Sequence, residues 1–444
     1  MKNTRLMVIV MLVAVCAMSW MLYLKGAAAE GSERNAVVQE ARDNRDKKLY
    51  QLAVDAYNEA LSLDESETLY NELLDTCEAY YAEDPSSSVR KKLVTACEAA
   101  TKAYPKRADY WERYAQLYLD NEDYVKAGAV LEKAKAAKAE SEKLDEQWQL
   151  AYYAYKVNYR GFSSISMAAS NGMYVASDDD GWGTVDTLGE DVLSFIYTYV
   201  GPVGEGGLVL AVTESGEAQL LGEDGVMHGR FQANVVQAGG YSDGLIPVLL
   251  EGRTDWCYVD ANGKEVLSGY LMAGTFQDGQ AAVQTRDGHW CLIDTEGKQC
   301  SGETWDEILL GVDGGYLHDG RAMMRSGEKW YLYDKYGDAV EDFSCDAIDI
   351  RIDSLIAFCE NGKWGFVSRS GKVYIEPAYD DARSFSNGIG AVCKEGLWGF
   401  VDEDGNLVVD YTFAEVGYFN EDGTCVVKMP DSLEYSLIEW YVAR

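Results

Sequence analysis

The chain of 444 residues is long enough for roughly two or three domains, and its hydrophobic content of 47% can fill their cores. Its net charge of −35 is concentrated in residues 161–444, which hold 17 Lys and Arg against 48 Asp and Glu, whereas residues 1–160 hold 22 against 26. Such an acidic surface repels phosphate backbones and argues against nucleic acid as a partner. With three His residues, the chain has little material for histidine-based catalysis or a zinc site.

The first segment, residues 1–33, contains the uncharged stretch LMVIVMLVAVCAMSWMLYL at 6–24, preceded by Lys2 and Arg5. A helix needs roughly 20 apolar residues to cross a bilayer, whereas the core of a signal peptide has about 7–15. We therefore predict a single-pass signal anchor in the cell membrane, with the bulk of the chain extracytoplasmic. The alternative is secretion after cleavage near Ala29, where three consecutive alanines fit a small-residue cleavage site.

Residues 34–160 have apolar residues at helical spacing and few β-branched residues, so we predict α-helices there. In DYWERYAQLYLDNEDYVKAGAVLEKA, large and small residues form one stripe on each of two antiparallel helices. The stripe residues are Trp111, Tyr114, Ala115, Tyr118, Ala127, Leu131 and Ala134. The small residues let the helices approach closely, and the aromatic rings fill the remaining gaps.

This stripe resembles the tetratricopeptide repeat, which implies helical hairpins with a concave groove for a peptide. The alternative is a stalk that separates the second domain from the membrane. We interpret AYYAYKVNY at 151–159 as a capping helix and RGFSS at 160–164 as the domain boundary. Cys77 and Cys97, on adjacent predicted helices, are the one cysteine pair for which a disulfide stays open.

Residues 161–444 repeat one pattern, in which a Trp is followed by Asp four residues later and by Gly seven residues later. The tryptophans are Trp182, Trp256, Trp290, Trp330, Trp364 and Trp398. The Asp positions are Asp186, Asp260, Asp294, Asp334 and Asp402, with Ser368 in the remaining copy. The Gly positions are Gly189, Gly263, Gly297, Gly337, Gly371 and Gly405, and Gly225 belongs to a degenerate copy that has Ala218 in place of Trp. A truncated copy begins at Tyr435, which gives eight units at steps of 34 to 40 residues, a period typical of propellers and solenoids.

Each residue of the pattern has a structural reason. The Trp opens a run with period-2 alternation, which predicts a short strand. Asp can accept hydrogen bonds from backbone N–H groups of a turn, and Gly supplies the positive φ that closes a tight hairpin. A second strand precedes each Trp, as in GIGAV at 388–392. Each unit is therefore predicted to be a meander of three or four strands.

The motifs Lys363-Trp364-Gly365-Phe366 and Trp398-Gly399-Phe400, with IEPAYDDARSFSNGIGAV at 375–392, resemble the WG (KWG) repeats of bacterial proteins. The resemblance covers residues 161–444 and implies an all-β interaction domain without catalytic residues. Gly after Trp leaves room for a neighbouring backbone or ring. Three copies depart from the motif, with Cys257, Cys291 and Tyr331 in place of the Gly, and a small Cys fits the same space.

The fold class predicted from these elements is an α + β multidomain protein with a transmembrane helix, tetratricopeptide-like hairpins and a propeller-like array of seven or eight units. An extra strand at 163–170 and a missing strand after Tyr435 favour closure of a ring between the two ends of the array. The alternative is an open β-solenoid.

For function, we predict a non-catalytic scaffold protein without cofactors or a metal that binds a protein partner through the helical repeats and the acidic β array. Residues 178–183 and 402–406 lack the ligand spacing of an EF-type calcium loop, and no nucleophile, phosphate-loop or zinc motif is present. EKWYLYDKYGDA at 328–339 is similar to a choline-binding repeat, although choline repeats are much shorter than this period. The alternatives are therefore recognition of a cell-envelope glycan or choline-type ligand by exposed aromatic rings and, more remotely, a hydrolase.

Overall fold

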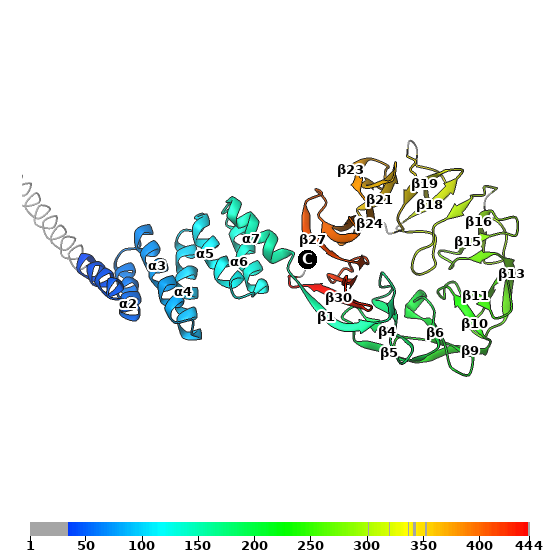
Figure 1. The fold of residues 1–444 in the computed structure, drawn as a ribbon, viewed down its shortest axis with the longest axis horizontal. Coiled ribbons are helices and arrows are strands. Elements are labelled where there is room, and N and C mark those ends of the chain that lie inside the picture. Colours follow the sequence, from blue (N-terminus) through cyan, green and yellow to red (C-terminus); the bar gives the residue numbers. More distant parts are fainter. Residues whose placement is uncertain are drawn as a thin grey trace, which may run out of the picture. The chain divides into compact units, whose positions relative to one another are not determined.

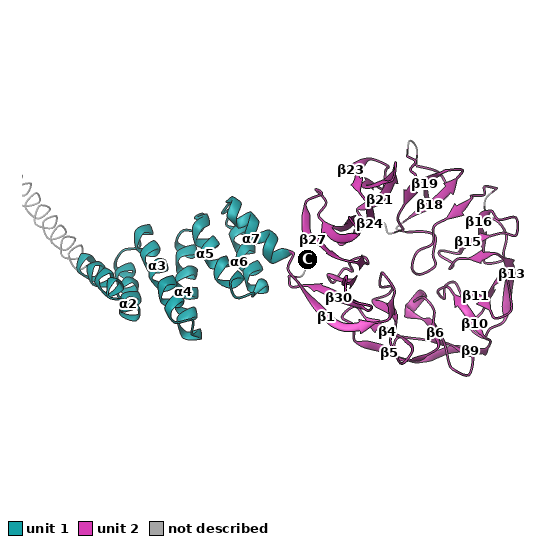
Figure 2. Cartoon of the chain, in the orientation of Figure 1, with its two compact units in different colours: residues 1–152 teal, residues 153–444 magenta. Residues whose placement is uncertain are grey.

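The computed structural model describes residues 34–442 apart from 301, 319, 336, 341, 342, 351 and 352. The chain divides into two compact units, Met1–Tyr152 and Tyr153–Arg444, one helical and one made of strands (Figures 1 and 2). The predicted anchor at 6–24 lies outside the described residues. Within them, no helix combines the length and the apolar character that a membrane crossing requires.

The described part of the helical unit contains seven helices. They cover residues 34–46, α2 (Tyr50–Leu63), α3 (Glu67–Glu83), α4 (Ser87–Ala103), α5 (Ala108–Leu119), α6 (Tyr124–Ala136) and α7 (Glu142–Tyr152). Local signals set the helix starts: Ser66 Oγ accepts from Leu69 N before α3, and the Asp123 side chain accepts from Lys126 N before α6. Consecutive helices pack against each other around one continuous core, which confirms the prediction of a helical N-terminal region.

The second unit is a β-propeller of eight antiparallel sheets that follow one another around a ring (Figure 1). Blade 1 contains β2 (Ser164–Ile165), β3 (Met173–Ser177), β4 (Trp182–Asp186) and β5 (Asp191–Tyr197). Blade 2 contains β6 (Tyr199–Val200), β7 (Val209–Val212), β8 (Glu217–Leu221) and β9 (Met227–Gln232). Blade 3 contains β10 (Val235–Ala238), β11 (Ile246–Leu250), β12 (Trp256–Val259) and β13 (Glu265–Tyr270). Blade 4 contains β14 (Met272–Ala273), β15 (Gln280–Gln284) and β16 (Trp290–Asp294).

The other four blades have the same order of strands. Blade 5 contains β17 (Glu307–Ile308), β18 (Arg321–Ser326) and β19 (Lys329–Asp334). Blade 6 contains β20 (Ala347–Ile348), β21 (Leu355–Glu360), β22 (Lys363–Ser368) and β23 (Val373–Tyr379). Blade 7 contains β24 (Asp381–Ser386), β25 (Ile389–Lys394), β26 (Leu397–Val401) and β27 (Leu407–Phe413). Blade 8 contains β28 (Glu415–Val416), β29 (Thr424–Lys428), β30 (Tyr435–Trp440) and, from the start of the unit, β1 (Tyr155–Phe162).

Blade 8 closes the ring because it takes strands from both ends of the unit. β1 pairs antiparallel with β30, in a register that places Tyr155 opposite Trp440 and Asn158 opposite Leu437. The Asn158 side chain also donates to Leu188 O in the turn of blade 1, at 2.8 Å. The predicted propeller-like ring is therefore confirmed, and the open solenoid is wrong.

Three details of the sequence interpretation need correction. Residues 151–159 do not form a capping helix, because α7 ends at Tyr152 and β1 begins at Tyr155. The spare strand that closes the ring is β1 rather than residues 163–170, which contribute the short inner strand β2 of blade 1. The division between the two units falls between Tyr152 and Tyr153, so β1 belongs to the β unit. The predicted boundary at 160 assigns most of this strand to the helical domain.

Candidate functional site

The repeat tryptophans lie at the start of the third strand of their blades, and most are buried. Trp256, Trp290, Trp330 and Trp398 are 6–8% exposed, whereas Trp182 and Trp364 are half-buried. Trp398 of blade 7 packs in one cluster with Phe419 of blade 8. Trp256 of blade 3 likewise packs with Phe276 of blade 4. These indoles fill the interfaces between blades, so in most blades they are not accessible to a ligand.

The Gly that follows Trp in the WG motif lies under the backbone of the outer strand. A Cβ added at Gly399 would lie 2.6 Å from Val409 O, and one added at Gly183 would lie 2.5 Å from Leu193 O. The outer strand bulges over this Gly in blades 1, 6 and 7. In blade 3 a register shift also lies next to the equivalent position, between Trp256 and Cys257, but Cys257 itself pairs with Ser268.

The Asp of each repeat organises the hairpin between the third and fourth strands. Asp402 Oδ1 accepts from Asp404 N at 3.1 Å and from Asn406 N at 2.8 Å. The carboxylates of Asp186, Asp260 and Asp294 each accept the equivalent pair of N–H bonds, and Asp334 accepts from Asp338 N. Ser368 replaces Asp in blade 6 and accepts from Lys372 N through its hydroxyl.

The Gly of the same turn has two roles. Gly189, Gly225, Gly263, Gly297, Gly337, Gly371 and Gly405 all have φ between 73° and 88°. Several of these glycines also lie against the outer strand region of the preceding blade. A Cβ added at Gly371 of blade 6 would lie 2.8 Å from Phe343 Cβ of blade 5. A Cβ added at Gly297 of blade 4 would lie 2.8 Å from the Leu267 side chain of blade 3. The turn therefore joins one blade to the next.

We expect Asp402→Ala to lower the free energy of unfolding by about 1–2 kcal/mol, because two N–H groups of the turn lose their acceptor. Chemical denaturation followed by circular dichroism measures this difference. Asp404→Ala is the matched control, since its exposed carboxylate has no hydrogen-bond partner among the described residues. Equal losses in the two variants would contradict the role assigned to Asp402.

A second set of aspartates, which the sequence interpretation missed, also connects blades. Asp380 accepts from Lys363 Nζ of blade 6 at 2.6 Å and from Glu395 N in a hairpin of blade 7 at 2.8 Å. The ammonium of Lys363 and the Glu395 N–H hold the pKa of Asp380 below its usual value. Asp346 makes the same two contacts one blade earlier, with Lys329 and Asn361 N. The sequence did contain a signal for these contacts: Asp346 and Asp380 follow Lys329 and Lys363, the Lys residues directly before a repeat Trp, at the same spacing.

Cysteine side chains are packing residues in both units. Eight of the described cysteines are buried free thiols, Cys77, Cys97, Cys257, Cys291, Cys345, Cys359, Cys393 and Cys425, and Cys300 is free and exposed. Cys77 and Cys97 are therefore not joined by a disulfide. Burial raises the pKa of the Cys77 thiol to about 12, so this thiol stays protonated and unreactive at neutral pH.

We expect alkylation of the native protein at neutral pH to modify Cys300 well before the eight buried thiols. Peptide mapping by mass spectrometry after a short exposure identifies the modified sites, and Cys300→Ser should remove the early one. Denaturant should make the remaining thiols reactive. Early modification of Cys77 or Cys257 in the native state would contradict the packing described above.

The predicted helical stripe lies in the core of its unit. Trp111, Tyr114, Ala115 and Tyr118 on α5 and Ala127, Leu131 and Ala134 on α6 are all buried in one cluster. The Trp111 indole donates to Pro105 O at 2.8 Å. Ala115 and Ala127 are fully buried, which fits their predicted position where two helices approach closely.

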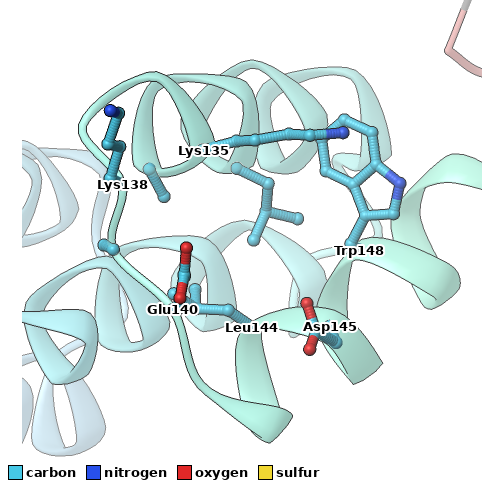
Figure 3. A pocket seen from close by; sticks show the side chains of 9 residues that line it. Lys135, Lys138, Glu140, Leu144, Asp145 and Trp148 are labelled. Atoms are coloured by element: carbon cyan, nitrogen blue, oxygen red, sulfur yellow. The ribbon is translucent and has the colours of Figure 1, made fainter.

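Charged side chains line two of the surface cavities of the helical unit. One, of about 420 Å³, lies over α3, α5 and α7, and Glu78, Arg113 and Lys143 line it. Arg113 is held there by Asp75 at 2.7 Å and Glu78 at 2.6 Å. The other, of about 400 Å³, lies between α6 and α7, where Lys135 extends over the Trp148 ring (Figure 3).

In the β unit, a polar cluster connects three consecutive blades beside the centre of the ring. Tyr418 of blade 8 donates through its hydroxyl to Asp349 Oδ1 of blade 6 at 2.6 Å, and Ser384 N of blade 7 donates to Asp349 Oδ2 at 2.7 Å. Arg383 of blade 7 stacks over the rings of Trp398 and Tyr418. Among the described residues, no group of three or more His, Cys, Asp or Glu side chains could hold a metal ion.

The β unit is a propeller built from repeats, with eight blades that are joined by buried tryptophans and Asp-x-x-Gly turns. It follows a set of helical hairpins in the chain. The family description "WG containing repeat" matches residues 364–398 and 398–429. The chain is a WG-repeat protein with a helical N-terminal region.

Comparison with solved structures gives distant similarities to each unit. BamB from Moraxella catarrhalis is 12% identical with a TM-score of 0.43, over 66% of this chain and 98% of BamB. The Sgt2 TPR domain from Aspergillus fumigatus is 23% identical with a TM-score of 0.21, over 27% of this chain and 76% of that domain. No curated protein sequence matches the chain.

Proposed function

We propose that this WG-repeat protein is a non-catalytic scaffold that binds a protein partner through the helical repeats and the acidic β-propeller. The observation that carries the proposal is the burial of the repeat tryptophans, because side chains that fill blade interfaces build a rigid platform rather than a row of ligand cages. The cavity over α3, α5 and α7 supports the helical part of the proposal, because both carboxylates and cations line it.

The location proposed for this scaffold is the outer side of a cell membrane, with the N-terminal segment as a single-pass anchor. The support is the length of the uncharged stretch at 6–24 and the two cations before it. A partner of the propeller should carry a basic surface, because residues 161–444 have a net charge of −31. Binding to the propeller should therefore weaken as salt rises.

The test is affinity capture from crosslinked membrane fractions with three baits: the full chain, residues 34–152 and residues 153–444. One abundant protein retained by the full chain and by at least one unit supports the proposal. In the helical bait, Lys143→Glu should reduce capture if the cavity over α3, α5 and α7 is the docking site, whereas Lys102→Glu, exposed on α4, is the matched control. If none of the baits retains a protein, the scaffold proposal fails.

Recognition of a cell-envelope glycan is the second candidate, and one observation favours it. Trp182 is half-buried and, with Tyr199, lines a cavity of about 280 Å³. Saturation of Trp fluorescence quenching by envelope glycan fragments, absent in Trp182→Phe, would favour this second function over the scaffold.

A further inference from the structure

The middle of the propeller contains two adjoining cavities, of about 280 Å³ and about 130 Å³. Ala168, Ser170 and Val312 line both of them. Val312 lies on the loop between β17 and β18 of blade 5, whereas Ala168 and Ser170 belong to blade 1. The loop therefore reaches from one blade toward another that is not its neighbour, and it borders both cavities.

This loop is fixed in place by hydrogen bonds to blade 4. Thr275 Oγ1 donates to Asp313 O at 2.6 Å, and Thr275 N donates to Gly314 O at 2.8 Å. The loop also closes on itself, since Gly315 N donates to Asp313 Oδ1 at 2.9 Å. Val312 and the Asp313 carboxylate consequently keep defined positions between the cavities.

The larger cavity is apolar. Its walls include the side chains of Met173, Val175, Val203, Trp182 and Tyr199. The Trp182 and Tyr199 rings lie 6.5 Å apart with an interplanar angle of 50°. The Tyr199 hydroxyl is held by the backbone of Ala238, so its ring is a fixed wall. Such a cavity suits an aliphatic or aromatic group.

The smaller cavity presents hydrogen-bond acceptors. Ser170 and Tyr418 line it, and each has already donated its hydroxyl hydrogen, to Val203 O and to Asp349 Oδ1 respectively. Asp313 adds a carboxylate, and His318 completes the polar lining. The lone pairs of both hydroxyls and the carboxylate can only accept, whereas the His318 imidazole can donate or accept. Because acceptors predominate, the complementary ligand group is a donor with a positive charge.

We propose that the centre of the propeller binds a small primary amine that carries an apolar substituent. The ammonium group occupies the smaller cavity and donates to Asp313 and to the oxygens of Ser170 and Tyr418. The apolar substituent lies in the larger cavity against Trp182 and Tyr199. This site is separate from the helical cavity over α3, α5 and α7, and it includes the Trp182 and Tyr199 cavity considered above for a glycan.

Isothermal titration calorimetry of the full-length protein tests the proposal with butylamine, 2-phenylethylamine and tryptamine as probes. We expect at least one amine to bind with a stoichiometry of one. The alcohol analogue of that amine should bind at least about tenfold more weakly, because it lacks the charge. Asp313→Asn should weaken amine binding by about tenfold or more, whereas Asp404→Asn, which removes a carboxylate from an exposed turn, should leave it unchanged.

A steric variant gives a second criterion that does not depend on charge. Val312→Trp fills space that borders both cavities and should abolish amine binding. The thermal unfolding midpoint of this variant, compared with that of the unaltered chain, tests whether the propeller still folds. The proposal is overturned if no amine binds, if Asp313→Asn binds the amine as tightly as the unaltered chain, or if a folded Val312→Trp variant retains full affinity. If that variant does not fold, Ser170→Val is used in its place, since it removes one of the acceptors.

Discussion

Removal of β1 should open the propeller ring and lower the thermal unfolding midpoint of the β unit by on the order of 10 °C or more. The comparison is between chains that begin at 153 and at 163. Without β1, blade 8 loses its outer strand and the pairing with β30. Phe162, which is fully buried, is also lost, and removal of such a ring costs about 3–5 kcal/mol. Differential scanning calorimetry measures the midpoint and the cooperativity of unfolding.

A synthetic peptide of residues 153–162 provides the control for this experiment. If β1 acts by closing the ring, the peptide should raise the unfolding midpoint of the chain that begins at 163. A peptide with Phe162→Ala and Asn158→Ala should restore much less, because the first change removes a buried ring and the second removes the hydrogen bond to Leu188 O. Equal stability of the two chains without peptide would show that closure by β1 does not stabilise the propeller.

Ring closure was predicted from the sequence, but the strand that closes the ring was placed wrongly. The stretch from Tyr155 to Arg160 does alternate between apolar and polar residues, which is a strand signal, but residues 151–159 were interpreted as one capping helix. It also follows α7 after only Tyr153 and Ala154, without a Gly or Pro to signal the end of the helix. Its partner β30 is at the other end of the chain, so no local pattern identifies this strand as the one that closes the ring.

The repeat residues were accessible to sequence reasoning because their roles are local and recur in every blade. Asp402 and Gly405 shape a turn within their own hairpin, and the same spacing in other copies makes the pattern visible. The half-burial of Trp182 could not be foreseen in this way, because it depends on the side chains that blade 2 places beside it, such as Tyr199 and Val200, rather than on its own repeat. The central cavities have no sequence signal, since Val312 and Ser170 meet only when the ring closes.

The second large effect is expected for the Gly of the WG motif, where Gly365→Ala should cost about 3 kcal/mol of unfolding free energy. A Cβ at this position would lie 2.7 Å from Pro377 N and close to Ile375 O. Both atoms belong to the backbone of β23, which is held in the sheet by its pairing with β22 and cannot move aside as a side chain could. Denaturant unfolding of the full-length chain measures the loss.

Gly362 in the same hairpin is the matched control for Gly365. Its φ is +74°, yet an added Cβ would meet nothing within 4 Å, so Gly362→Ala introduces backbone strain without a collision and should cost about 1 kcal/mol. If Gly365→Ala were no worse than Gly362→Ala, the close approach of the outer strand could not be the reason for Gly after Trp. A larger loss at Gly365 would identify the close approach of the β23 backbone as the reason for Gly after Trp in blade 6.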